Sequence, residues 1–121
     1  MGHYKDLIVW QKGMRLAVAV YRLSADFPKS EQYGLTSQLR RSAISIPSNT
    51  AEGNGRGSRS DYLHFLHIAR GSCFELDTQL LLCQEIDLCG EKQLEPLFLL
   101  VKEIGQLLNA LIRKLSTPSN I

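Results

Sequence analysis

The residues with the clearest chemical potential are an aspartate and two histidines in the middle of the chain. Asp61, His64 and His67 are spaced three residues apart, so a helix would place them on one face. Such side chains can bind a metal ion, but a metal site in a helical bundle normally takes ligands from several helices. No other segment has a Glu-x-x-His pattern. We therefore expect a solvated polar face with no metal or other cofactor, and a metal-dependent enzyme is the weakest of three functional hypotheses.

Other catalytic patterns are missing from the sequence. Ser42, Ser45 and Ser48 have no nucleophile-elbow context and no evident base, so they resemble small packing residues. The glycine-rich stretch at residues 53–59 lacks the Lys-Ser/Thr ending of a phosphate-binding P-loop. The sequence predicts that the protein is not an enzyme.

Four arginines are candidates for nucleic-acid binding. Arg40 and Arg41 lie in a helical segment, and Arg56 and Arg59 lie in the glycine-rich loop. A loop that leads into a helix can hold phosphate through backbone N–H groups, the helix dipole and guanidinium groups. The leading hypothesis is that these residues form a basic surface that binds RNA or a nucleic-acid-processing protein.

The same region supports a structural alternative. Arg41, Glu52, Arg70 and Glu75 could neutralise each other in a network between two helices. The protein would then be an interaction or scaffold module that binds no nucleic acid. Both hypotheses remain open at this point.

Four helical segments position these residues, and they span about residues 6–24, 33–53, 60–88 and 92–115. In each, apolar residues recur at spacings of three and four, which is typical of one buried helix face. Pro47 interrupts the second segment, where we expect a kink rather than a break. Short connections between four helices predict a single domain over residues 1–121, an all-α antiparallel up-and-down four-helix bundle.

The helices carry more apolar surface than one core needs. Residues 80–82 and 97–101 are unbroken apolar runs, so their side chains must point in several directions around the helix. A small monomer rarely exposes that much contiguous hydrocarbon. We expect the protein to form a homo-oligomer.

Composition limits the setting in which the protein works. The chain has 121 residues, 44% hydrophobic and 21% charged, with a net charge of +2. Its three cysteines form no C-x-x-C pair, and no cationic segment followed by an apolar stretch opens the chain. These features predict a reducing cytoplasm and no membrane partner.

Charge is uneven along the chain: residues 40–70 hold five arginines against two acids, and residues 75–95 hold six acids against Lys92.

Five ordered blocks also carry a family resemblance. They lie at residues 6–12 (DLIVWQK), 27–29 (FPK), 35–41 (LTSQLRR), 45–53 (SIPSNTAEG) and 69–72 (ARGS). Together they resemble the signature blocks of a bacterial four-helix-bundle family encoded in intervening sequences of 23S ribosomal RNA genes. Thr50 departs from this pattern, since the family usually has isoleucine there.

The resemblance implies an antiparallel four-helix bundle that forms a ring-shaped homopentamer with no known enzymatic activity. Related bundle proteins are accessory proteins of diversity-generating retroelements, in which a basic pentamer engages a reverse transcriptase and nucleic acid. The present chain is far less basic, so RNA binding follows from it only by analogy.

Overall fold

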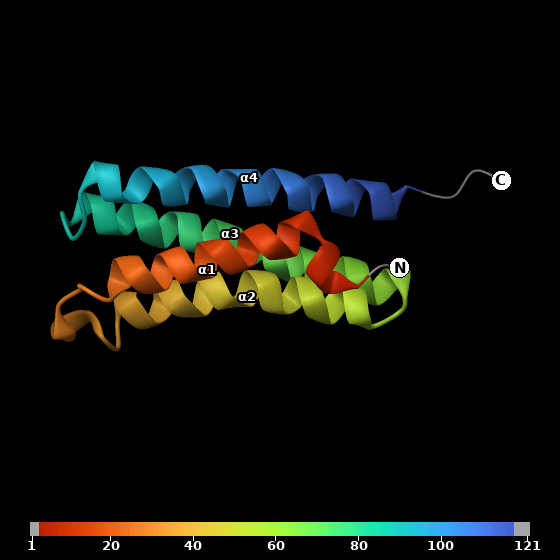
Figure 1. Cartoon of the computed structure of the whole chain (residues 1–121), viewed down its shortest axis with the longest axis horizontal. Helices are drawn as coiled ribbons and strands as arrows, with labels where there is room; N and C mark the ends of the chain where they lie inside the picture. Colours follow the sequence, from red (N-terminus) through yellow and green to blue (C-terminus); the bar gives the residue numbers. More distant parts are fainter. Residues whose placement is uncertain (1–2, 118–121) are drawn as a thin grey trace.

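The computed structural model describes residues 3–117 as four long helices that run alternately up and down (Figure 1). The helices are α1 (Ile8–Ser24), α2 (Leu35–Gly55), α3 (Arg59–Glu85) and α4 (Glu91–Ser116), with short 3-10 helices at Tyr4–Asp6 and Lys29–Glu31. The α2–α3 connection lies at one end of the bundle, and the α1–α2 and α3–α4 connections lie at the other (Figure 1). The predicted all-α antiparallel four-helix bundle is confirmed.

Local signals explain where α3 begins and ends. The Ser58 Oγ accepts a hydrogen bond from the Asp61 N–H at 3.1 Å, which caps the first turn. At the other end, Asp87 adopts a left-handed conformation with φ 58°, and the Leu88 N–H donates to the Cys83 carbonyl at 2.9 Å. This turn ends α3 at Glu85, a few residues before the predicted boundary.

Helix α2 continues through Pro47 without a break. Proline at this position cannot donate a backbone hydrogen bond, but its ring is buried against α1. A Cβ added to Gly13 would lie 3.4 Å from two carbon atoms of the Pro47 ring, so the glycine lets the two helices approach closely. A second close approach joins α2 to α3, where the Ser45 and Ser72 hydroxyls lie 2.7 Å apart.

One hydrophobic core runs the length of the bundle and takes side chains from all four helices. Its largest fully buried aliphatic side chains are Leu16, Val20, Leu39, Ile46, Leu66, Leu76, Leu80, Leu94, Ile104 and Leu108. This burial removes hydrocarbon from water and is the main stabilising term for the fold. None of the helices between residues 3 and 117 combines the length and apolar character needed to cross a bilayer.

Candidate interaction surfaces

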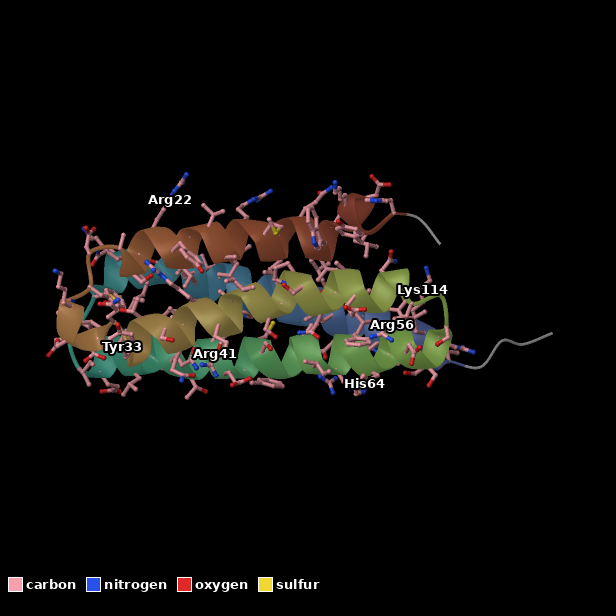
Figure 2. All side chains as sticks on the ribbon, turned by 90° about the horizontal axis from the view of Figure 1, so that it is seen from below. Arg22, Tyr33, Arg41, Arg56, His64 and Lys114 are labelled. Carbon is pink, nitrogen blue, oxygen red and sulfur yellow. The ribbon has the colours of Figure 1, made fainter. Side chains whose placement is uncertain are left out.

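The four arginines predicted to bind nucleic acid do not form one surface. Figure 2 shows Arg41 and Arg56 far apart along the bundle. Arg40 and Arg56 are separated by sixteen residues of nearly continuous helix, so at 1.5 Å per residue they lie roughly 24 Å apart along the axis. The predicted site therefore divides into two groups near opposite ends of α2.

Arg40 is engaged inside the fold rather than available to a ligand. Its Nε donates to the Ser24 Oγ at 2.8 Å, and its guanidinium also donates to the Tyr21 carbonyl at 3.3 Å. The guanidinium carbon lies 4.4 Å from the centre of the Tyr21 ring. Arg40 thus ties α2 to the last turn of α1, where it adds a second donor to the Tyr21 carbonyl that already accepts from the Ala25 N–H. Arg41, the next residue, is exposed.

Arg56 and Arg59 have internal partners but remain at the surface. The Arg56 Nε donates to the Glu52 carboxylate at 2.8 Å, and its guanidinium carbon lies 5.0 Å from the centre of the Phe65 ring. Arg59 donates to the carbonyl groups of Leu115 and Thr117, so it caps the end of α4. Since a guanidinium has five N–H donors, both residues keep donors for another ligand.

The predicted network of Arg41, Glu52, Arg70 and Glu75 is not formed. Glu52 pairs with Arg56, four residues along the same helix. Arg70 donates to the Asn109 side chain on α4 at 3.1 Å and lies 3.0 Å from the His67 Nδ1. Over residues 3–117, no ion pair joins any two members of the predicted network. The prediction failed because Arg70 lies against α4 rather than α2.

The antiparallel topology builds a basic cluster that the sequence analysis missed. Because Arg59 binds the end of α4, the last turn of α4 lies beside the first turn of α3, and this turn carries Arg113 and Lys114. Figure 2 shows Lys114 and Arg56 at the same end of the bundle. We define Arg56, Arg59, Arg113 and Lys114 as the basic end. All four are exposed, and cations in the last turn also complement the α4 dipole.

Acidic residues gather at the opposite end of the bundle. The α3–α4 turn carries Glu85, Asp87 and Glu91, and Glu31 from the α1–α2 connection lies near the same turn, where it acts electrostatically on Cys83. Burial, followed by the nearby Cys89 thiol, raises the pKa of Cys83 to about 12. Lys29, Arg41 and Lys92 lie near the same end, so the uneven charge along the sequence becomes only a small charge separation along the bundle axis.

The histidine pair does not build a metal site with its neighbours. The His67 ring lies against Arg70, and the His64 ring meets the Phe65 ring edge-on, with centroids 5.1 Å apart. In the part of the chain that the structure describes, no three His, Cys, Asp or Glu side chains come together to hold a metal ion. Asp61 instead occupies the capped first turn of α3.

A long apolar groove runs between α3 and α4. It consists of two adjoining hollows of about 420 and 400 Å³ that share Phe98 and Lys102. Three large apolar side chains at the groove are strongly exposed: Phe74 (67%), Leu99 (62%) and Leu81 (46%). The apolar runs predicted to exceed the needs of the core therefore do reach the surface, while Leu80 and Leu97 from the same runs are buried. We call this feature the α3–α4 groove.

Fold and surfaces together define a four-helix bundle with an exposed apolar groove between α3 and α4. The family model for the 23S rRNA-intervening sequence protein matches residues 5–110. The chain belongs to this family, as the sequence blocks predicted.

A solved structure supports the same assignment. The chain is similar to a protein of unknown function from the S23 ribosomal protein family of Bacteroides thetaiotaomicron VPI-5482, with 26% sequence identity and a TM-score of 0.79. The similarity covers 88% of this chain and 99% of that chain. No curated protein matches the chain. The function of the family is unknown, and neither comparison carries an enzymatic activity.

Proposed function

We propose that the protein is a non-catalytic bundle that assembles with copies of itself, as a ring-shaped homopentamer, and binds RNA through its basic end. The observation that carries this proposal is the convergence of Arg56, Arg59, Arg113 and Lys114 at one end of the bundle. Two separate chain segments, the α2–α3 connection and the last turn of α4, supply these cations. The resemblance to accessory proteins that engage nucleic acid favours RNA as the polyanion by analogy.

Assembly would strengthen a weak basic site. Four cations on one subunit, two of them partly engaged, can contact only a few phosphates. Each phosphate contact contributes modestly and depends on salt, but linked copies of a site bind far more tightly than one copy. The three free, buried cysteines fit a reducing compartment, and we expect the protein to work in the cytoplasm.

The second candidate function is a scaffold that binds proteins only. The observation in its favour is that Arg40, Arg56 and Arg59 all bind groups within the same chain. In this case the basic end would serve the fold, by pairing with Glu52 and capping α4. The two functions differ in their response to removal of Arg113 and Lys114.

A matched pair of double variants tests the proposal. We expect the Arg113→Ala/Lys114→Ala protein to bind structured RNA roughly tenfold more weakly at low salt, with a shallower salt dependence, because about two phosphate contacts are lost. The control protein, Lys29→Ala/Lys92→Ala, loses the same charge from exposed positions near the acidic end and should bind RNA as the unmodified protein does. Gel-shift titrations at several salt concentrations measure both. Equal weakening by the two variants, or no binding by the unmodified protein at low salt, would contradict RNA binding by the basic end.

A further inference from the structure

The outer face of α1 is apolar and positively charged. Met14 and Val18 are 42% and 45% exposed although they are large apolar residues. Arg15 and Arg22 share this face with Val18, since residues 15, 18 and 22 fall at helical spacing. Helix α1 contains no aspartate or glutamate. We call Met14, Arg15, Val18 and Arg22 the α1 face.

The α3–α4 groove has the opposite charge. Asp77 lines one of its two hollows, and Glu91 and Glu95 line the other. Lys102 is the one cation among the lining residues of both hollows. An apolar floor with a net negative rim matches an apolar helix face that carries only positive charge.

We propose that the α1 face of one copy of this chain occupies the α3–α4 groove of a second copy. This inference rests on the self-assembly in the proposed function and specifies which surfaces meet. The contact is heterologous, because it joins two different faces of the same molecule.

Contacts inside the bundle fix the height of Arg15 and Arg22 along its axis. Lys12 on α1 pairs with Glu103 on α4 at 3.0 Å, so these two residues are level. Because α1 and α4 are antiparallel and both rise 1.5 Å per residue, Arg15 is level with Leu100 and Arg22 with Gln93.

The acidic residues of the groove lie at nearly the same two heights. The Arg70–Asn109 hydrogen bond of 3.1 Å sets the register of α3 against α4. By the same rise per residue, Asp77 is level with Lys102 on α4. Lys102 is two residues from Leu100, which has the height of Arg15. Glu95 is likewise two residues from Gln93, which has the height of Arg22. Both offsets are about 3 Å and have the same direction. Arginine side chains are long enough to span this distance.

The matching heights predict how two copies are related. Turning one copy about an axis parallel to the bundle, with almost no sliding along it, brings Arg15 toward Asp77 and Arg22 toward Glu95. Val18 then faces the apolar side chains of Leu81 and Leu99. A heterologous contact without a slide closes into a ring rather than a filament. Every subunit would point the same way, so all basic ends would lie on one side of the ring.

Charge exchange and cross-linking test this contact in the full-length protein. Glu95→Arg and Arg22→Glu should each raise the dissociation constant of the assembly by about tenfold or more, since each places like charges together. The double variant should restore assembly. Arg22→Cys and Glu95→Cys proteins, mixed under mild oxidation, should form a mixed cross-linked dimer, while each alone forms none. Analytical ultracentrifugation and non-reducing gels give the readouts.

The outcomes distinguish a wrong contact between the α1 face and the α3–α4 groove from a failure of self-assembly. If the unmodified protein assembles but the double variant stays dissociated, or if the Arg22→Cys protein cross-links with itself, other faces meet and this contact is wrong, while self-assembly stands. If the unmodified protein is a monomer even at high concentration, both ideas fail. Circular dichroism should show all variants folded, because Arg22 and Glu95 are exposed.

Discussion

The basic end and the α3–α4 groove are two surfaces of one bundle that should bind in different ways. Charge dominates the basic end, and its cations come from two segments, the α2–α3 connection and the end of α4, that meet only in the fold. Hydrocarbon dominates the groove, where Phe74, Leu81 and Leu99 are exposed. Electrostatic binding weakens as salt rises, whereas burial of apolar surface does not. Substitutions or salt can therefore disable one of the two surfaces without disabling the other.

The largest effect is expected from placing charge in the groove. Phe74→Glu combined with Leu99→Glu should abolish assembly at micromolar concentration, because two exposed apolar side chains become acids that the covered groove cannot solvate. The monomer should stay helical, since both positions lie outside the core. Light scattering measures the assembly. An unchanged particle mass would show that the groove stays uncovered.

Salt should separate the two surfaces without any substitution. Between 50 and 200 mM salt, RNA affinity should fall by about tenfold or more, since even two phosphate contacts per bound RNA release counterions. Particle mass over the same range should stay constant. Parallel gel shifts and sedimentation experiments test this, and RNA affinity that does not respond to salt would argue against binding by the basic end.

The neighbouring residues Arg40 and Arg41 offer a smaller and sharper contrast. Arg40→Ala should lower the free energy of unfolding by about 1–2 kcal/mol, because the Ser24 and Tyr21 partners lose a charged donor. Arg41→Ala should change it by less than about 0.5 kcal/mol, as expected for an exposed side chain away from such contacts. Urea unfolding of both variants measures these changes in the free energy of unfolding. Marked destabilisation by Arg41→Ala would revive the ion-pair network.

The smallest effect concerns Cys73, a buried thiol that lines the groove. Burial, with a smaller contribution from Asp77, raises its pKa to about 12 from an ordinary value of 9.0. A raised pKa means that the folded protein holds this proton more tightly, so the thiol contributes fully below pH 9, and its contribution falls as pH rises from 9 toward 12.

The stability difference between the unmodified protein and a Cys73→Ala variant should therefore shrink above pH 9. The change can reach about 1.4 kcal/mol per pH unit at most. Urea unfolding at pH 8, 9 and 10.5 measures it, and the variant serves as the control for pH effects that do not involve Cys73. A constant difference would indicate that Cys73 keeps an ordinary pKa in the fold.

Much of the fold could be predicted because it depends on local chain properties. Apolar spacing located all four helices. The end of α3 was misplaced because Asp87, rather than a glycine, adopts the left-handed conformation of the turn. An L-residue rarely does so, and this choice depends on how the turn returns the chain to α4.

The candidate site was harder to predict than the fold. Arg56 and Arg59 were identified from their glycine-rich loop, but Arg113 and Lys114 had no local signal. Long flexible side chains choose partners by distance in space, so the pairing of Arg40 with Ser24 and of Arg70 with Asn109 could not be inferred from spacing along one helix.

The sequence by itself determined the number of helices, their apolar faces and the excess hydrocarbon on α3 and α4, because each follows from residue type and helical periodicity. Only the tertiary structure decided which charges face one another. The antiparallel packing placed the end of α4 beside Arg59 and set the heights of Arg15, Arg22, Asp77 and Glu95. Electrostatic interactions act through space over a few ångströms, and the packing of the helices sets those distances.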